Sequence, residues 1–210
     1  MIHRQTRFFV GTPSRLLTGI ALLLLAAAPS WAEPKRYVID PEHLSIGFLV
    51  QHIGYASVLG LFRKAEGSFT FDEDTGQLAD LKITVDTASV FTSHDKRDKH
   101  LRGEDFLDSE QHPQMVFVAR SGQFKKQQPA PLDGELTLRG VTRPVALQAT
   151  WNKSDRYPIP AAGAERFPHV LGASARGTIR RSEFGMTYAV DNGWVGDTVD
   201  LIIEFEARRQ

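Results

Sequence analysis

Charged and histidine side chains crowd one segment of this chain, residues 87–117, whereas most of the chain alternates apolar and polar positions. Carboxylates, imidazoles and cations this close together could hold a metal ion, bind a phosphate or move a proton. The segment interrupts the strand pattern and is predicted to be one short helical insert near residues 93–112. Its central titratable residues are His94, Asp95, Lys96, Arg97, Asp98, Lys99, His100, Arg102, Glu104 and Asp105.

A metal site is the first reading to weigh for this insert. His94 and Asp98 are four residues apart, so they would share one face of a helix, with His100 close by. The spacing matches neither the His-Glu-x-x-His helix nor a Cys/His zinc pattern. An ion pair between Asp98 and Arg102, also four apart, is the alternative use of that carboxylate. We therefore predict no metal site and no cofactor.

Anion binding is the second reading. Arginine makes bidentate contacts with phosphate, and lysine supplies a point charge. The alternatives are a solvated helix face, or an Arg97 tied to backbone and acids so that it pins the insert to the fold. As a group, the insert is predicted to form the rim of a ligand site. The predicted rim residues, which would meet the polar head of a ligand, are Arg97, Asp98, His100 and Arg102.

Signals for other chemistry are weak. The segment Gly172-Ala173-Ser174-Ala175-Arg176 lacks the final glycine of a nucleophile elbow, and no glycine-rich phosphate loop is present. The chain has no cysteine, which excludes disulfides, thiolate catalysis and cysteine-ligated metals. The 25 basic and 25 acidic residues give no reason to expect a nucleic-acid partner. We predict no catalytic residues.

The first 32 residues have the layout of a signal peptide. Three arginines precede an apolar run at residues 16–28, and Ser30-Trp31-Ala32 places small residues before a cut after Ala32. The apolar run is shorter than the about 20 residues that a membrane span needs. We therefore expect residues 1–32 to be cleaved and the product to be periplasmic or secreted. An uncleaved anchor is the alternative.

Outside the insert, apolar residues recur with the period of two that β-strands require. The 178 residues that remain after cleavage suit a single domain, residues 33–210. About eight antiparallel strands can close on themselves and hold one small ligand. We predict an all-β fold, an eight-stranded antiparallel barrel, with a sandwich as the alternative. The predicted strands are residues 44–52, 58–62, 67–71, 77–90, 114–123, 134–138, 145–151, 170–179 and 199–205, with a long loop at 154–169.

One face of the first strand, with Ile46, Phe48 and Val50, is assigned to the barrel interior, and His52 continues it. His52 would therefore place a polar atom in an apolar lumen, either bound to a ligand or buried with a partner of its own. The phenylalanine-rich pattern fits a filled core and a ligand cavity equally well. The predicted lumen residues are Ile46, Phe48, Val50, His52, Phe62, Phe69, Phe71, Ile83 and Phe117.

Four groups of residues, spread over almost the whole of residues 33–210, together resemble the YceI-like family of secreted, lipocalin-like proteins, described as polyisoprenoid-binding. Any one group would be weak evidence, but the four occur in the family's order. They are Tyr37-x-Ile39-Asp40-x-x-His43-x-x-Ile46-x-Phe48-x-Val50-x-His52; Arg97-Asp98-x-His100-Leu101-Arg102 with Asp105-Phe106-Leu107-Asp108 and His112-Pro113; Gly134-x-Leu136-Thr137-Leu138-Arg139-Gly140-Val141-Thr142-Arg143-Pro144-Val145; and Arg180-Arg181-Ser182-x-Phe184-Gly185-Met186.

The resemblance implies a barrel whose apolar lumen takes one long flexible chain, a polyisoprenoid or similar amphiphilic lipid. We therefore expect a periplasmic or secreted carrier with such a lipid as its partner. Two alternatives stay open. One is a lipid-acting hydrolase or isomerase with His52, His100 or Asp98 as acid or base, and the other is an interaction module with a filled barrel. The sequence leaves open whether the chain forms a homodimer and whether a membrane partner receives the cargo.

Overall fold

The computed structural model describes residues 1, 3, 33–159 and 167–210. The predicted signal peptide at residues 1–32 therefore falls outside the described residues except at Met1 and His3. Contacts within the chain separate residues 1–31 from a compact unit of residues 32–210, and the fold described below belongs to the second unit. Among the described residues, no helix has both the length and the apolar character needed to cross a membrane.

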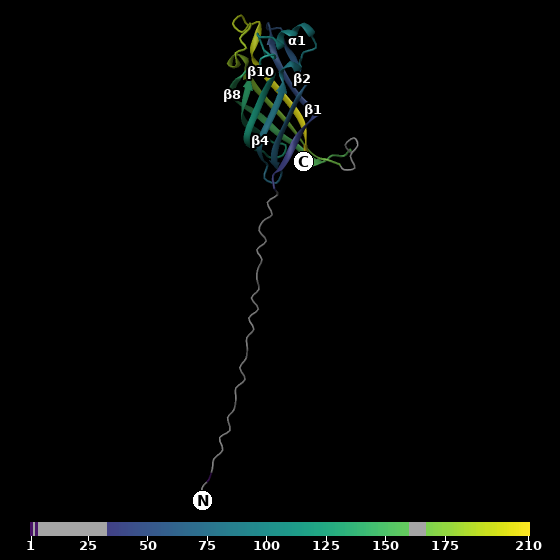
Figure 1. Cartoon of the computed structure of the whole chain (residues 1–210), viewed down its shortest axis with the longest axis vertical. Helices are drawn as coiled ribbons and strands as arrows, with labels where there is room; N and C mark the ends of the chain where they lie inside the picture. The colour runs from purple at the N-terminus through teal and green to yellow at the C-terminus, as the bar shows by residue number, and fades with distance from the viewer. Residues whose placement is uncertain (2, 4–32, 160–166) are drawn as a thin grey trace. The chain divides into compact units, whose positions relative to one another are not determined.

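The compact unit is a closed antiparallel barrel (Figure 1). The sheet order is β10-β9-β8-β7-β6-β4-β3-β1, and β10 pairs back onto β1, which confirms the predicted eight-stranded barrel. Two shorter strands, β2 and β5, extend β3 and β4 in the barrel wall, because β2 and β3 pair with the two halves of β1. The strands are β1 (Lys35–His52), β2 (Ala56–Phe62), β3 (Ala65–Asp72), β4 (Gln77–Asp86), β5 (Val90–Phe91), β6 (Gln114–Gln123), β7 (Pro129–Leu138), β8 (Val141–Arg156), β9 (His169–Arg180) and β10 (Val195–Arg209).

Alternation along the strands builds the wall of the barrel. On β8, Val145, Leu147 and Ala149 are buried, whereas the residues between them are exposed. Because successive side chains of a strand point to opposite faces, each strand contributes one apolar row to the interior. These rows form one continuous apolar cluster around the barrel axis.

In the part of the chain that the structure describes, three short helical elements interrupt the strands. The helix α1 (Asp95–Arg102) lies at one end of the barrel, opposite the end at which the chain terminates (Figure 1). It is shorter than the predicted insert because Gly103 ends it, and turns occupy much of residues 103–112. The 3₁₀ turns η1 (Thr87–Ser89) and η2 (Arg181–Phe184) follow β4 and β9.

The predicted loop at residues 154–169 is wrong at its two ends, and its residues 160–166 lie outside the described residues. Strand β8 continues through Arg156 and pairs with β9 as far as His169, past an irregularity between Trp151 and Lys153. Composition favoured a loop there, but backbone hydrogen bonds to a neighbouring strand do not depend on side-chain type. The last strand is also longer than predicted, because β10 pairs along its whole length with β1 and β9.

Glycines in the wall let aromatic rings lie flat against it. A Cβ atom on Gly60 would lie 2.1 Å from Cζ of Phe48, and one on Gly134 would lie 2.4 Å from Cζ of Phe117. Each ring therefore occupies the space that a side chain on the neighbouring strand would fill.

Candidate ligand-binding cavity and its charged mouth

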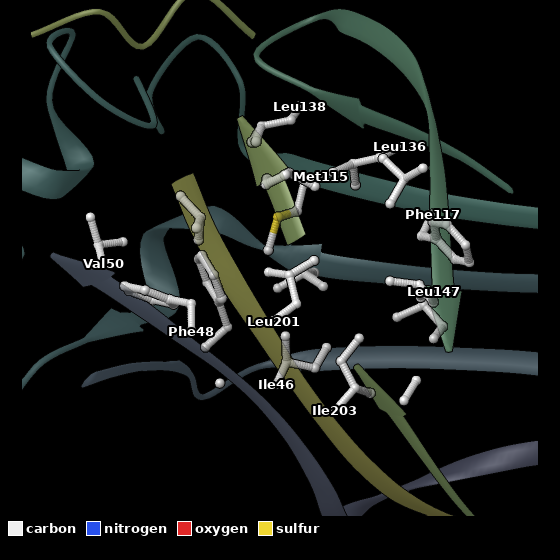
Figure 2. Close-up of a pocket in the computed structure, with 18 of the residues that line it drawn as sticks. Ile46, Phe48, Val50, Met115, Phe117, Leu136, Leu138, Leu147, Leu201 and Ile203 are labelled. Carbon is white, nitrogen blue, oxygen red and sulfur yellow. The ribbon is translucent and has the colours of Figure 1, made fainter. Parts of the chain in front are cut away.

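The barrel is hollow. It encloses a cavity of about 590 Å³, within the range of roughly 300–1,000 Å³ that is typical of small-molecule sites. Figure 2 shows Ile46 and Phe48 of β1 beside their register partners Ile203 and Leu201 on the adjacent strand β10, with Phe117 and Leu136 of β6 and β7 on another side of the same space. The cavity wall is almost entirely apolar carbon. The arrangement therefore separates an apolar molecule from water.

All nine predicted lumen residues contribute to the cavity wall. Phe69 and Phe71 are almost completely buried deep in the barrel, and Phe48 and Phe62 are partly exposed along β1 and β2. His52 differs from the prediction that it sits inside the lumen, because its side chain is exposed at the end of β1. Strand β1 extends beyond the enclosed part of the barrel, so His52, at its end, lies at the mouth.

Charged groups occur at one end of the cavity and have one sign. Lys96, Arg97 and Arg181 line the cavity, together with His52 and His100. Among the described residues, no aspartate or glutamate contributes to the lining. All three cations come from α1 and η2. The mouth therefore offers positive charge and N–H donors next to an apolar chamber.

The helix α1 is held at the mouth by a buried carboxylate. Asp98 accepts hydrogen bonds from the backbone N–H of Thr92, at 2.8 Å, and from its hydroxyl. Arg97 donates to the Thr92 hydroxyl and carbonyl oxygens, both at 2.7 Å. At the start of the helix, His94 accepts from the backbone N–H of Arg97 at 3.2 Å. The alternative in which Arg97 pins the insert therefore agrees with these contacts.

The structure does not bring all four predicted rim residues to the cavity. Arg97 and His100 line it, but Asp98 and Arg102 do not. Asp98 faces Thr92, and Arg102 donates to the carbonyl oxygen of Val90 at 3.4 Å, so the Asp98–Arg102 ion pair offered as an alternative does not form. Helix spacing suggested Arg102, four residues later, as the partner of Asp98. The actual partner is Thr92, six residues earlier, in a segment that is not helical.

Arg181 is a mouth residue that the sequence analysis did not assign. Its side chain is 2% exposed and donates to four backbone carbonyl oxygens, those of Met186, Tyr188, Val195 and Gly196, at 2.7–2.8 Å. Burial lowers its pKa below the ordinary value, and this is partly opposed by the Asp197 carboxylate. Its place in the Arg-Arg-Ser-x-Phe-Gly segment was a signal that could have drawn attention to it.

Aromatic rings narrow the mouth beside Arg181. His100 packs edge-on against both Phe106 and Tyr188, with ring centroids 5.0 Å apart in each pair. The Arg181 guanidinium lies 5.6 Å from the centre of the Phe106 ring, a cation–π contact. His100 also pairs with Asp105 at 2.8 Å. These contacts join α1 to the loop between η2 and β10 across the cavity entrance.

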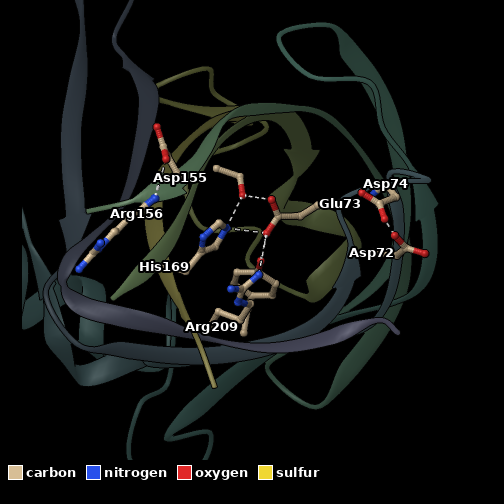
Figure 3. Close-up of polar contacts among 9 residues, drawn as sticks. Asp72, Glu73, Asp74, Asp155, Arg156, His169 and Arg209 are labelled. Atoms are coloured by element: carbon tan, nitrogen blue, oxygen red, sulfur yellow. Dashed lines mark hydrogen bonds and ion pairs between the residues drawn. The ribbon is translucent and has the colours of Figure 1, made fainter. Parts of the chain in front are cut away.

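The opposite end of the barrel is closed by a polar cluster around Glu73 (Figure 3). Glu73 accepts hydrogen bonds from the hydroxyls of Tyr37 and Ser154, and it contacts Nε2 of His169 at 2.7 Å and Arg209 at 3.9 Å. Burial and the nearby Glu73 carboxylate raise the pKa of Tyr37 well above its ordinary value. The cluster ties the β3–β4 turn to β1, β8, β9 and β10.

The cluster contains serine, histidine and glutamate but lacks the geometry of a catalytic triad. Nε2 of His169 faces both the Ser154 hydroxyl, at 2.9 Å, and Glu73. A triad requires the acid on one ring nitrogen and the serine on the other, so that the histidine can take the serine proton. Among the described residues, no group of three histidines or carboxylates is arranged to hold a metal ion.

Replacing Glu73 by glutamine should destabilise the protein at neutral pH but not in acid. Burial alone would raise the pKa of Glu73, but hydrogen bonds and the charge of His169 outweigh it and hold the pKa below its ordinary value of 4.5. A lowered folded-state pKa contributes stability above the unfolded-state pKa, and this is lost as pH falls through the folded-state value. Urea unfolding of wild type and Glu73→Gln should therefore converge below pH 4.5. Glu66→Gln, exposed on β3, is the control, and a gap that persists in acid would contradict the prediction.

The fold and the cavity together define a class: hollow antiparallel β-barrel proteins with one apolar chamber and a polar mouth. Residues 37–207 match the model of the YceI-like domain, and the chain therefore belongs to the YceI-like family. It is 36% identical over 196 residues to a protein YceI of Escherichia coli, which covers 92% of this chain and 97% of that protein. The family predicted from the sequence is thus confirmed.

Solved structures support the same fold. The YceI protein of Campylobacter jejuni superposes with a TM-score of 0.62 at 26% identity, over 76% of this chain and 90% of that one. A polyisoprenoid binding domain from Saccharophagus degradans superposes with a TM-score of 0.60 at 10% identity, over 85% of this chain and all of that one.

Proposed function

We propose that this protein binds a polyisoprenoid or another long-chain amphiphilic lipid in its barrel and carries it outside the cytoplasm. The hollow apolar cavity of about 590 Å³ carries the proposal. An interaction module with a filled barrel would have no reason to keep such a space, because unfilled apolar volume costs packing energy. The polyisoprenoid-binding domain from Saccharophagus degradans, which shares the fold, supports the choice of ligand class.

Transfer of the lipid chain from water into the cavity supplies the affinity. Each buried methylene contributes about 0.8 kcal/mol, so ten carbons would contribute about 8 kcal/mol before ordering costs of several kcal/mol. Micromolar or tighter binding therefore needs no ion pair. The wall residues predicted from the sequence, such as Phe69 and Ile83, would contact this chain along its length.

The charged mouth would receive the polar head of the lipid. Lys96, Arg97 and Arg181 line that end, with His100 beside them. A head placed there keeps contact with water and donors, and the chain points toward the closed end at Glu73. This polarity fixes one orientation of the cargo.

Catalysis is less well supported than binding. A general acid or base must reach the reacting atoms, at about 3 Å. Asp98 does not line the cavity, and its carboxylate already accepts from the N–H and the hydroxyl of Thr92. Export by the predicted signal peptide supports a periplasmic or secreted location, where a carrier would shield a lipid from water.

Native mass spectrometry of freshly purified protein tests the proposal. We expect a bound species whose mass, after organic extraction, is that of a long-chain lipid. The same spectrum reports whether subunits pair. An extract that contains no lipid-like mass, together with failure of added prenol or prenyl phosphate to bind, would overturn the proposal.

A further inference from the structure

Large apolar side chains that remain exposed gather beside the cavity mouth. Six of those among the described residues lie on two segments, the β1–β2 hairpin and the loop between η2 and β10. Tyr55 is 91% exposed and Trp194 is 57% exposed. The hairpin tip is joined to the loop by the Ile53–Trp194 backbone hydrogen bond, and exposed apolar side chains that lie together in this way mark an interaction site. We call these six residues the mouth patch: Ile53, Tyr55, Leu59, Leu61, Tyr188 and Trp194.

The two segments of the mouth patch are joined to each other and to the cavity. The backbone N–H of Ile53 donates to the carbonyl oxygen of Trp194 at 2.8 Å, and His52 pairs with both Ala56 and Val195. Ile53, Tyr188 and Trp194 also line the cavity. The apolar wall therefore continues from the inside of the barrel onto its outer surface without a polar break at these residues.

The tip of the hairpin holds an apolar residue in a conformation that disfavours it. Ile53 and Gly54 both have positive φ, 49° and 73°, and the N–H of Tyr55 donates to the carbonyl oxygen of His52 at 3.1 Å. This two-residue turn prefers asparagine, aspartate or glycine, and a β-branched residue there is strained. Ile53 is 45% exposed, so the chain itself does not fully bury it. A partner that covers the tip would account for an isoleucine at this position.

Charge identifies the partner. Residues 51–62 contain no lysine, arginine, aspartate or glutamate, whereas Lys96 and Lys99 are exposed on α1 at the same end of the barrel. Tyrosine and tryptophan favour the interface between lipid headgroups and hydrocarbon, and lysine ammonium groups can contact lipid phosphates. Asp95 and Asp191 reduce the local positive charge, so apolar contact must supply most of the binding.

We propose that the mouth patch docks the barrel on the surface of a phospholipid bilayer, with the cavity entrance facing the lipid. The inference rests on the proposed function in that the cargo is taken to be a lipid. Docking in this orientation would let the apolar chain pass between membrane and cavity along a continuous apolar surface. It would not have to cross water.

Flotation with vesicles of phosphatidylethanolamine and phosphatidylglycerol tests the proposal. Wild type and all variants should begin at the same N-terminal residue. Tyr55→Ser should lower the partition constant between water and vesicles about tenfold. This is the loss expected when one large side chain no longer inserts into the bilayer. Tyr55 does not line the cavity, so cargo binding measured without vesicles should not change. Ile53→Asn should lower flotation similarly while maintaining or raising Tm, because asparagine suits the turn. Ile159→Asn, exposed at the other end of the barrel, should float like wild type.

Several outcomes would overturn the docking proposal. They are absence of flotation by wild type, equal flotation of wild type and both mouth-patch variants, and a dimer in solution that Tyr55→Ser dissociates, which would make a second copy the occupant. The proposed function is judged separately by cargo binding in the absence of vesicles. Flotation that depends on the mouth patch in a protein that carries no lipid would leave docking in place and reject the carrier.

Discussion

Replacing Ala149 by phenylalanine should weaken binding of a long-chain lipid about a hundredfold while the barrel still folds. Ala149 lies on the cavity wall in the middle of β8, paired with Ala130 on one side and Ala175 on the other. The new ring would occupy space that about four methylenes of the cargo need, which corresponds to about 3 kcal/mol. Added volume enters an open cavity, so the overpacking cost of a filled core does not apply.

The matched control is Ala146→Phe on the same strand. Ala146 is exposed on the outer face of β8, so the same substitution adds the same area without entering the cavity. Isothermal titration with a prenyl phosphate, or competition with a fluorescent fatty acid, would measure both variants, and circular dichroism would check the fold. Equal affinities for Ala149→Phe and Ala146→Phe would place the ligand outside the barrel.

The barrel and its inner face were predictable because strand alternation reports side-chain direction locally. Val145, Leu147 and Ala149 alternate with exposed residues, so their common face follows from the sequence alone. The position of a residue along the barrel axis could not be predicted in the same way. His52 shares a face with Phe48, yet it lies at the mouth, because alternation does not say where the enclosed part of the barrel ends.

Whether the interior was filled or hollow could not be predicted. Phenylalanine suits both cases, and the difference lies in where each ring rests. Phe48 and Phe117 lie against Gly60 and Gly134, which are separated from them in the sequence and become neighbours only through sheet pairing. The space at the centre thus depends on register between strands.

The mouth was the least predictable part because non-local backbone groups build it. Arg180 and Arg181 are adjacent and identical in type, and nothing in the sequence says which one is buried. Two of the carbonyl oxygens that accept from Arg181 belong to Met186 and Tyr188, in a loop without periodic pattern, and two belong to the first residues of β10. Similarly, Asp98 accepts a hydrogen bond from Thr92, which lies in the segment before α1, and the spacing of residues along a helix does not predict this contact.

The two ends of the barrel differ in what their polar groups do. At the closed end, Glu73 is satisfied by side chains from several strands, and it does not line the cavity. At the mouth, Arg181 donates hydrogen bonds that hold the loop between η2 and β10. The side chains of Tyr188 and Trp194 in this loop line the cavity and are also exposed to solvent. The charge at the mouth is therefore also the structural support of the entrance.

Arg181→Met should cost about 4 kcal/mol of unfolding free energy, since loss of the donors leaves buried acceptors unpaired at about 1–3 kcal/mol each and water can reach some of them. Methionine preserves much of the side-chain volume but donates no hydrogen bond to the four carbonyl oxygens. Arg181→Lys should recover only a minor part of the lost unfolding free energy. One ammonium group cannot reach four carbonyl oxygens that are arranged around a planar guanidinium group. Urea unfolding of lipid-free protein would measure both variants.

Arg180→Met provides the matched control for this loss. Its side chain is 67% exposed and pairs at 2.9 Å with Asp197, which keeps its hydrogen bonds from Ser182 when Arg180 is replaced, so the loss should be only about 1 kcal/mol. Full rescue by Arg181→Lys would show that charge alone supports the entrance, and equal losses at the two positions would show that Arg181 has no special role. If the fork holds the loop, Arg181→Met should also weaken lipid binding when measured under conditions where the variant is folded, because Tyr188 and Trp194 would no longer be fixed at the cavity entrance.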